Sequence, residues 1–232
     1  DERLLAVAMP AGLLSQPTPD EGDSVLTRLA PYLGHEPGLV HRLDRPVSGV
    51  MVVAKDRDSA GELSSIIRDR KAAKCYLALV RTGVLPIAGM IREAILKVRP
   101  GKMVTDSTGR PAISRIAPIA FDPEAEMALV AIRLITGRMH QARVHLSAEV
   151  GAIVGDRKYG DVAPAGDGAA SDRAVGTGHR IALHAVLLKI PGKKRKTKLV
   201  LRCPPGDDFW ALAGGANLPR DTWDEAVESL LR

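Results

Sequence analysis

The sequence has few of the residues on which several classes of protein depend. Two of its 232 residues are cysteine, Cys75 and Cys203, and they lie far apart without a CxxC spacing. A structural zinc site needs clustered ligands and a disulfide scaffold needs many cysteines, so neither fits this chain. Both thiols are expected to be small apolar side chains in the core. Two Phe, two Trp and three Tyr are too few for a surface of stacked aromatic rings.

Long apolar runs and common cofactor motifs are also missing. No apolar run reaches the roughly 18–20 residues that cross a bilayer, and residues 1–3 do not resemble a signal peptide. We therefore expect a soluble, cytoplasmic protein without membrane contact. The chain has no P-loop, G-x-G-x-x-G or H-E-x-x-H motif. His140 and His145 lie five residues apart, unlike the i, i+4 pair of a helical metal site, so we expect no metal.

The chain does contain enough apolar sequence for one sizeable core. It is 45% hydrophobic and 26% charged, and no linker divides it, so residues 1–232 are expected to form a single domain. The net charge of +6 is unevenly spread, because residues 204–232 hold six acids and only two bases. A basic body with an acidic tail favours a polyanionic partner, most simply nucleic acid.

Apolar patterns predict many strands with interspersed helices. Strands are expected at residues 4–8, 38–42, 50–54, 73–80, 127–135, 181–190 and 197–202, with short strand pieces within 90–119. Helices are expected from the Ser24 cap to residue 32 and at 58–70, 139–150 and 223–231. Because the elements do not alternate regularly, we expect an α+β fold with a mixed, mainly antiparallel central sheet flanked by helices and loops. Residues 161–179 are expected to form a mobile surface loop, and the basic tip at 193–196 to contact phosphate or solvent.

The first candidate for chemistry is a carboxylate in a turn. Residues 38–49 (GLVHRLDRPVSG) place Asp44 after an apolar strand and between Arg42 and Arg45. Neighbouring cations favour the ionised carboxylate, which suits a nucleophile or an electrostatic stabiliser. The alternative is a turn aspartate that is paired with its neighbours.

An arginine and a tyrosine are the next candidates. In residues 136–145 (TGRMHQARVH), His140 and Arg143 fall on one helical face, where a guanidinium can clamp a carboxylate or a phosphate. The alternative is a solvated helix face. In residues 74–80 (KCYLALV), Tyr76 lies on an apolar strand. It either stacks on a nucleic-acid base and exchanges a proton through its hydroxyl, or is an ordinary core tyrosine.

Taken in order, these segments resemble the motifs of the RluA-type RNA pseudouridine synthases. Residues 41–44 with 48–49 are similar to the family's signature around its aspartate, and residues 74–78 to its tyrosine motif. Residues 136–146, followed by 153–156 and 159–160, resemble its arginine motif, and residues 183–185 resemble a short motif that follows. The resemblance covers roughly residues 3–210 and implies the family's mixed, mainly antiparallel sheet with a central RNA-binding cleft.

The resemblance also implies roles for individual residues. Asp44 is the implied catalytic residue, with Arg143 as its ion-pair partner and Tyr76 packed against the target base. Arg42 is implied to help extrude the uridine or to fill its place in the RNA. The residues implied at the substrate are His41, Arg42, Leu43, His140 and Leu183.

The implied reaction is isomerisation of uridine in ribosomal or transfer RNA to pseudouridine. The N1–C1′ bond breaks, the uracil rotates and C5 bonds to C1′, so no cofactor is needed. Two routes stay open, attack on C1′ by Asp44 and a glycal intermediate, and Tyr76 is a candidate acceptor for the C5 proton. We expect a monomer that recognises RNA through its own basic surface.

The sequence departs from the family pattern at one position, and two alternative functions stay open. Met9 stands where the family's first motif usually has a lysine, which puts any role of that lysine in doubt. An inactive RNA-binding module of the same fold is one alternative function. A glycosidic-bond hydrolase is another, for which Asp156 is the only candidate second carboxylate.

Overall fold

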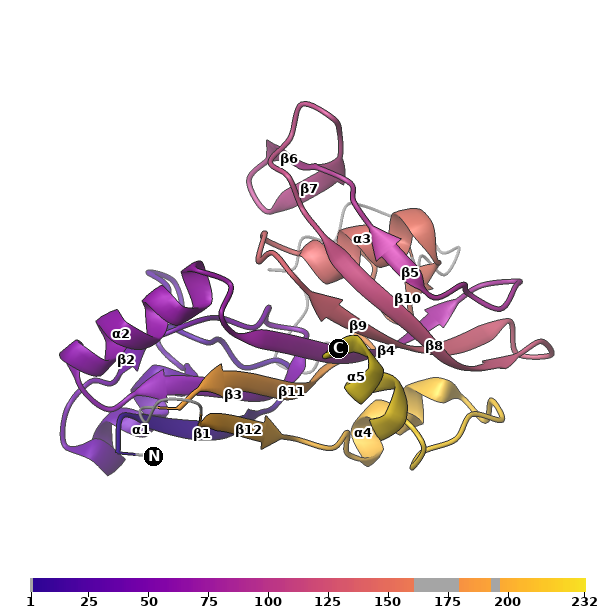
Figure 1. Cartoon of the computed structure of the whole chain (residues 1–232). Helices are drawn as coiled ribbons and strands as arrows, with labels where there is room; N and C mark the ends of the chain where they lie inside the picture. Colours follow the sequence, from indigo (N-terminus) through magenta and orange to yellow (C-terminus); the bar gives the residue numbers. More distant parts are fainter. Residues whose placement is uncertain (1, 161–179, 193–196) are drawn as a thin grey trace.

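A ten-stranded sheet forms the centre of the molecule (Figure 1). The computed structural model describes residues 2–160, 180–192 and 197–232, so the expectations for residues 161–179 and 193–196 lie outside the described residues. The main path of the sheet is β1-β3-β11-β4-β9-β8-β5, and β2, β10 and β12 pair with β3, β4 and β11. Its strands are β1 (Leu4–Met9), β2 (Gly38–Leu39), β3 (Ser48–Ala54), β4 (Ala73–Arg81), β5 (Gly89–Ile91), β8 (Ser114–Asp122), β9 (Met127–Leu134), β10 (Ala152–Ile153), β11 (Leu183–Pro191) and β12 (Lys198–Arg202).

The direction of the strands confirms the predicted fold class. Of the described strand pairs, only β3 and β11 run parallel, and all the others are antiparallel. The parallel pair places His184 opposite Ser48 and Ala185 opposite Gly49, directly after the turn that carries Asp44. The sheet is therefore mixed and mainly antiparallel, as the sequence pattern predicted.

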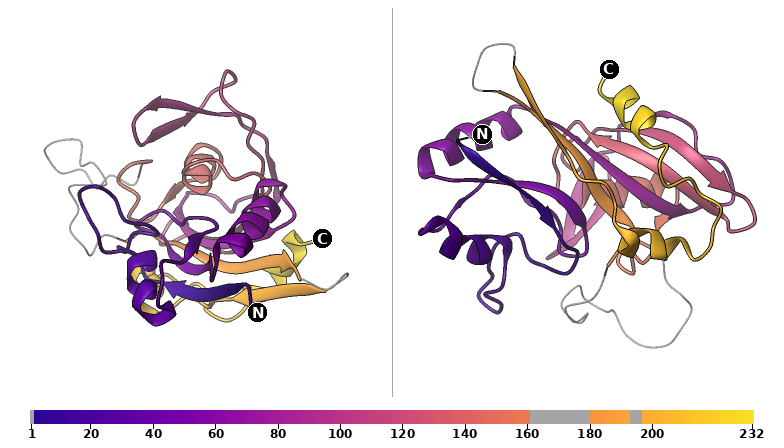
Figure 2. Two further views of the ribbon diagram at one scale, coloured as in Figure 1. Left: turned by 90° about the vertical axis from the view of Figure 1, so that its left-hand side faces the viewer. Right: turned by 90° about the horizontal axis from the view of Figure 1, so that it is seen from below.

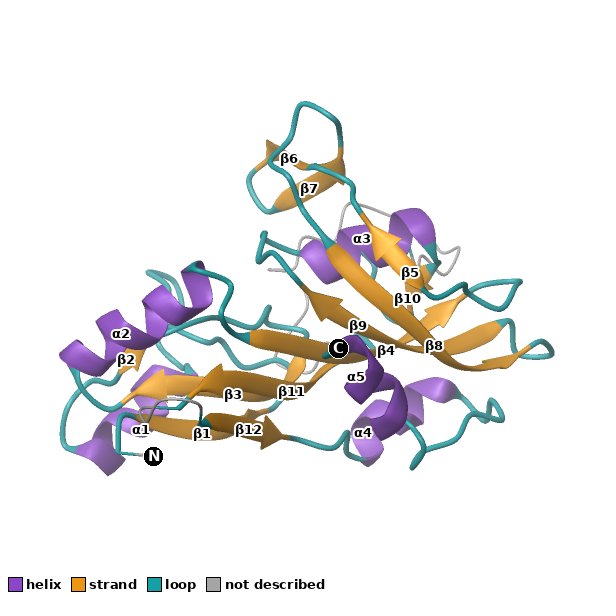
Figure 3. Cartoon of the chain, viewed as in Figure 1, coloured by secondary structure: helices purple, strands orange, loops and turns teal. Residues whose placement is uncertain are grey.

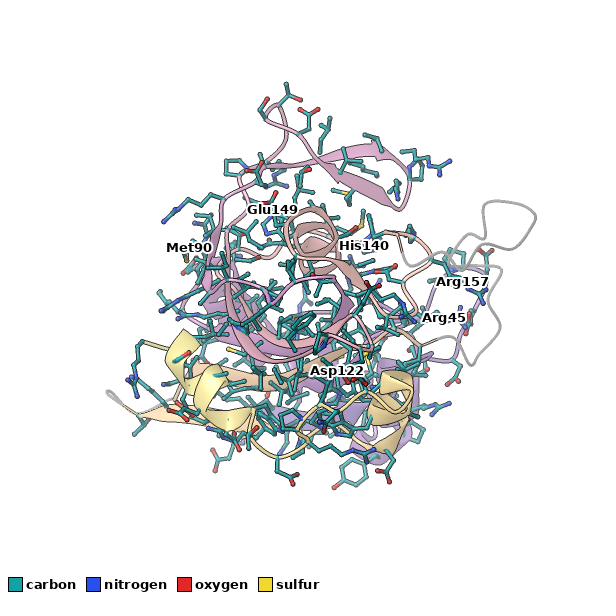
Figure 4. The ribbon with its side chains drawn as sticks, turned by 90° about the vertical axis from the view of Figure 1, so that its right-hand side faces the viewer. Arg45, Met90, Asp122, His140, Glu149 and Arg157 are labelled. Atoms are coloured by element: carbon teal, nitrogen blue, oxygen red, sulfur yellow. The ribbon has the colours of Figure 1, made fainter. Side chains whose placement is uncertain are left out.

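The central strands are apolar along their whole length because both faces of the sheet are covered. Every residue of β3 is buried, whereas β12 alternates between exposed and half-buried positions. The helices are α1 (Val25–Leu33), α2 (Arg57–Arg68), α3 (Gln141–Glu149), α4 (Asp207–Trp210) and α5 (Asp224–Leu230). Helix α3 contacts β9 and β10, and α5 contacts β8 and β9. Figure 2 and Figure 4 show α3 and the yellow C-terminal helices on opposite sides of the sheet.

Gly49 makes the parallel pairing of β3 and β11 possible. Its φ is +120°, and a Cβ there would lie 2.3 Å from the carbonyl oxygen of Ala185. Any larger residue would combine an unfavourable backbone conformation with a backbone clash. This close approach holds the turn of residues 44–48 against β11.

The main differences from the prediction are the end of one strand, the start of one helix and one short helix that was not predicted. The strand expected at residues 38–42 ends at Leu39, because the chain then leaves the sheet and lines a cavity. The helix expected from residue 139 begins at Gln141, because His140 has a left-handed φ of 56°. The short helix α4, which contains Phe209 and Trp210, was not predicted because four residues give no period to recognise.

A two-stranded sheet stands apart from the central one. Its strands β6 (Ile95–Arg99) and β7 (Lys102–Thr105) form the projecting hairpin at the top of Figure 3. Ile95 and Met103 pack with Val144 and Tyr159 in a small second core, so this hairpin is tied to α3. In the described part of the chain, no helix is long and apolar enough to cross a membrane.

Candidate active site

A cavity of about 440 Å³ lies where the predicted site residues converge. It is lined by the loop after β2, the start of β4, the loop before α3 and Leu183. All eight residues predicted for the site line it: His41, Arg42, Leu43, Asp44, Tyr76, His140, Arg143 and Leu183. A second cavity of about 480 Å³ shares Asp44 and His140 with the first, so Asp44 lies where the two meet. Figure 4 shows His140 and Arg45, which also lines this second cavity, on the same flank of the molecule.

Asp44 is held in a turn and is not paired with its sequence neighbours. Its carbonyl accepts a hydrogen bond from the Val47 backbone N–H at 2.9 Å. Arg45 instead forms an ion pair with Glu21 at 2.9 Å and donates to the Gly12 carbonyl. The carboxylate of Asp44 is 30% exposed and lies 3.6 Å from Nη1 of Arg143. The alternative of a locally paired turn aspartate is therefore wrong.

Ser15 fixes the residue before Asp44. Its hydroxyl donates to the Leu43 carbonyl at 2.8 Å and accepts from the Leu43 N–H at 3.1 Å. Ser15 is buried, and its Oγ also lies 3.6 Å from the sulfur of Met9. Met9 itself is a buried core residue that lines neither cavity. The side chain at this position therefore packs in the core and takes no place in the lining of the site.

Arg143 is a buried cation between two carboxylates. It is 1% exposed, and its Nε and Nη2 donate to Asp156 at 2.7 and 2.8 Å. Asp156 is fully buried and follows Gly155, whose φ is +82°. Arg143 therefore bridges Asp156 and Asp44, with Asp156 as the closer partner. The alternative of a solvated helix face is wrong, because residues 141–146 are all buried.

Tyr76 reaches the cavity from β4. It pairs with Ile132 of β9 and Ala185 of β11 and is 7% exposed. Burial, and then the negative charge of Asp44, raise the pKa of its phenol. Its hydroxyl is therefore protonated at neutral pH.

His140 is oriented by a tyrosine from the turn after β10. The Met103 N–H donates to the Tyr159 hydroxyl at 3.2 Å, and this hydroxyl lies 2.6 Å from Nδ1 of His140. In the neutral imidazole the phenol donates to Nδ1, which leaves the ring proton on Nε2, 3.9 Å from Asp44 Oδ2. Burial raises the pKa of Tyr159 to about 12, so it remains a donor.

The remaining predicted residues divide into anchors and exposed contacts. Nε2 of His41 accepts from the Val52 N–H at 3.1 Å, and burial, with the nearby charge of Lys74, lowers the pKa of His41 to about 3. His41 is therefore a neutral anchor between the site loop and β3. Arg42 is exposed, lines both cavities and forms no ion pair with a described residue.

A buried hydrogen-bond chain supports the other end of the site loop. Arg180 donates to the hydroxyl of Ser48 at 2.8 Å, and this hydroxyl lies 2.7 Å from Nδ1 of His184. Nε2 of His184 faces the Cys203 carbonyl at 2.8 Å, so it carries the ring proton and Nδ1 accepts from Ser48. Burial is the main cause that lowers the pKa of His184 to about 4. The imidazole is therefore neutral in this arrangement.

Sequence reasoning missed the partner role of Asp156 and the orienting role of Tyr159. Both belong to residues 153–160, which follow the arginine segment closely. An acid and a tyrosine in a turn directly after a buried arginine helix were the available signal.

Comparison with known proteins gives a consistent result. The family model described as RNA pseudouridylate synthase matches residues 3–148. The dual-specificity RNA pseudouridine synthase RluA of Salmonella typhimurium is 34% identical over 209 residues, which cover 88% of this chain and 90% of that protein. The RluA protein of Escherichia coli K12 is 32% identical with the same coverage.

The solved structures that match have the same fold. Human RNA pseudouridylate synthase domain containing 4 is 26% identical, with a TM-score of 0.69 over 92% of this chain and 90% of that chain. Human RNA pseudouridylate synthase domain containing 1 superposes over 100% of this chain and 92% of that one, with a TM-score of 0.76 and 24% identity.

Proposed function

The chain belongs to the RNA pseudouridylate synthase family and is an isomerase of uridine in RNA, and on this premise we propose that Asp44 is its catalytic residue. The observation that carries the proposal is the meeting of Asp44, Tyr76 and Arg143 in one cavity, with Arg143 Nη1 3.6 Å from the Asp44 carboxylate. A volume of about 440 Å³ lies within the range of sites that enclose a small ligand. A single extruded nucleotide is a ligand of that class.

The reaction rearranges the target nucleotide without adding or removing atoms. The N1–C1′ bond breaks, the uracil turns, and a C5–C1′ bond forms. C5 then loses its proton and N1 gains one, so the product is an isomer of the substrate. The target must first leave the base stack, which costs a few kcal/mol and is easier in a loop.

Asp44 acts at C1′ in either route, as a nucleophile or through a glycal. Its partly exposed carboxylate is accessible from both cavities, and the guanidinium of the buried Arg143 lies 3.6 Å from it. The bidentate bonds to Asp156 fix the guanidinium, so Arg143 stabilises charge at Asp44 without having to reorganise. Arg143 and Asp156 therefore position and stabilise the reacting carboxylate.

Tyr76 stacks on the uracil and relays the C5 proton. Its phenol is protonated at neutral pH, so the transfer is concerted. The Tyr76 oxygen accepts the C5 proton in the same step in which the phenol proton passes to water. Arg42, exposed at the mouth of both cavities, contacts the RNA from which the uridine is extruded. His41, Leu43, His140 and Leu183 form the remaining walls around the nucleotide.

The substrate class follows from the relatives. The RluA proteins are described as dual-specificity enzymes, and a Saccharomyces cerevisiae relative, 32% identical over 181 residues, as a tRNA pseudouridine(31) synthase. That match covers 68% of this chain and 45% of the yeast protein. We propose ribosomal or transfer RNA as the substrate, and a single catalytic domain that works as a cytoplasmic monomer without a cofactor.

The alternative of a glycosidic-bond hydrolase lacks its second carboxylate. Asp156 is fully buried and both of its oxygens accept hydrogen bonds from Arg143, so it is not available to protonate a leaving group. An inactive RNA-binding module would not need an accessible carboxylate at the centre of two cavities.

Nucleoside analysis of treated RNA tests the proposal. Ribosomal and transfer RNA are incubated separately with the protein, digested and separated by chromatography. Pseudouridine without free uracil is the expected product. Free uracil would support the hydrolase, and tight binding of both RNAs without product would support the inactive module.

A further inference from the structure

The lining of the cavity carries far more positive than negative charge. Among the residues that the structure describes, six arginines and lysines line it, and Asp44 is the one carboxylate. Arg143 is compensated by Asp156 and Asp44, and Arg68 lies 3.8 Å from Asp69. The others are Arg42, Arg70, Lys74 and Arg138. Arg42 lies beside Asp44, whereas the other three come from the loop after α2, the start of β4 and the loop before α3.

Arg138 is the centre of a cluster of like charges. Its Nε donates to the Pro111 carbonyl at 3.0 Å, which anchors the guanidinium at the cavity. Burial, and then the positive charges of Arg110 and Arg70, lower the pKa of Arg138. No described carboxylate forms an ion pair with Arg70, Arg110 or Arg138. Arg70 and Arg138 both line the cavity, and Arg110 directly precedes Pro111, whose carbonyl anchors Arg138. Three cations placed together in this way beside the site indicate an anionic ligand.

Arg70 occupies a backbone position that normally belongs to glycine. It follows the C-cap Asp69 of α2 and has a φ of +60°. Its N–H bonds to the Ile67 carbonyl and the Lys71 N–H to the Ile66 carbonyl, which is the Schellman pattern. Glycine fits this conformation without strain, so an arginine here lowers the stability of the fold relative to glycine.

Lys74 extends the same charge into the cavity. Its Nζ lies 3.0 Å from the place that a Cβ on Gly137 would occupy, so the bare glycine makes room for the ammonium. Lys74 is half-buried and has no carboxylate partner among the described residues, and burial lowers the pKa of its ammonium. Because Gly137 directly precedes Arg138, the ammonium lies beside the loop that carries Arg138, and Lys74, Arg70 and Arg138 all line the cavity.

We propose that Arg70, Arg110 and Arg138, with Lys74 behind them, form a phosphate-binding subsite for the RNA backbone next to the target uridine. The guanidinium groups match phosphate oxygens bidentately, and a polyanionic strand relieves their mutual repulsion. This inference rests on the proposed function. It assigns the strand that flanks the extruded nucleotide to the α2–β4 side of the cavity.

Arg70→Gly separates this role from a structural one. Glycine removes the charge but suits the left-handed backbone, so the melting temperature of the Arg70→Gly variant should equal or exceed that of the wild type. Its affinity for a short oligouridylate should fall about tenfold, as should those of Arg138→Gln and Arg110→Gln. Arg57→Gln is the matched control, because Arg57 is exposed at the other end of the same helix and should bind like the wild type.

Salt dependence and a neutral-phosphate scan complete the test. Each removed contact should reduce the slope of log affinity against log salt by about 0.7. The triple variant combines Arg70→Gly, Arg110→Gln and Arg138→Gln. Replacing one phosphodiester beside the target by a methylphosphonate should weaken RNA binding by the wild type but not by the triple variant. Wild-type affinity and slope in the triple variant, or equal loss from the neutral linkage in both proteins, would overturn the subsite. The proposed function is tested separately, by pseudouridine formation in the wild type.

Discussion

The buried ion pair of Arg143 and Asp156 allows the clearest quantitative prediction. Asp156→Asn keeps the shape of the side chain but replaces an acceptor oxygen by an NH₂ donor that faces the guanidinium at 2.7–2.8 Å. Arg143 is 1% exposed, so water cannot replace the lost partner. Removing one member of a buried pair costs about 3–5 kcal/mol, which lowers the melting temperature of a domain of this size by about 10 °C.

The same change has a catalytic consequence. Asp44 also forms an ion pair with Arg143, at 3.6 Å. We expect the freed guanidinium to turn toward Asp44, which would reduce turnover more than RNA affinity. Initial rates of pseudouridine formation and RNA binding should be measured below the melting temperature of the variant.

The surface of the molecule supplies the control. Arg28 and Asp23 form the same bidentate arrangement at 2.7 and 2.8 Å, but both side chains are more than half exposed. Asp23→Asn should leave the melting temperature and the turnover unchanged, because exposed ion pairs contribute little. Equal melting temperatures for Asp156→Asn and the wild type would refute the reasoning.

Three further predictions concern the base, the turn and pH. Tyr76→Phe should keep the melting temperature and RNA affinity but slow turnover by about 10²-fold or more, and an unchanged rate would reduce the role of the residue to stacking. Gly49→Ala should lower the free energy of unfolding in urea by about 3 kcal/mol, because the new Cβ would lie 2.3 Å from the Ala185 carbonyl oxygen. The control Gly61→Ala, on the open surface of a helix, should raise the free energy of unfolding slightly. Burial lowers the pKa of His184 in the folded state to about 4, from an ordinary value of 6.5. Its neutral ring therefore contributes about 3 kcal/mol to the free energy of unfolding above pH 6.5, and this contribution is lost as the pH falls toward 4. Urea unfolding at several pH values should show this slope, and His184→Asn should flatten it; an equally steep slope in the variant would contradict the assignment.

The sequence predicted the central sheet well because its strands are apolar throughout. β3, β4 and β9 are nearly completely buried, and runs of β-branched and aliphatic residues identify such strands without any long-range information. Helix α2 was also predictable, because its buried residues Leu63 and Ile66 recur at helical spacing. The strand at residues 38–42 was overextended, since local apolarity does not distinguish a strand from a loop that lines a cavity.

Contacts between distant segments explain what the sequence did not reveal. Arg143 was predicted to pair with Asp44, but only the fold shows that Asp156 makes the shorter contacts. The cluster of Arg70, Arg110 and Arg138 comes from three separate loops, none of which has a distinctive pattern alone. Charge clusters of this kind depend on how the strands are ordered in the sheet, which local periodicity does not encode.

Tritium release from RNA labelled at uridine C5 tests the central claim most directly. The wild type and Asp44→Asn are compared on the same ribosomal and transfer RNA, with RNA binding measured in parallel. The catalytic role of Asp44 predicts release by the wild type and none by the variant, with similar affinity for RNA. Release by Asp44→Asn at the wild-type rate would contradict it.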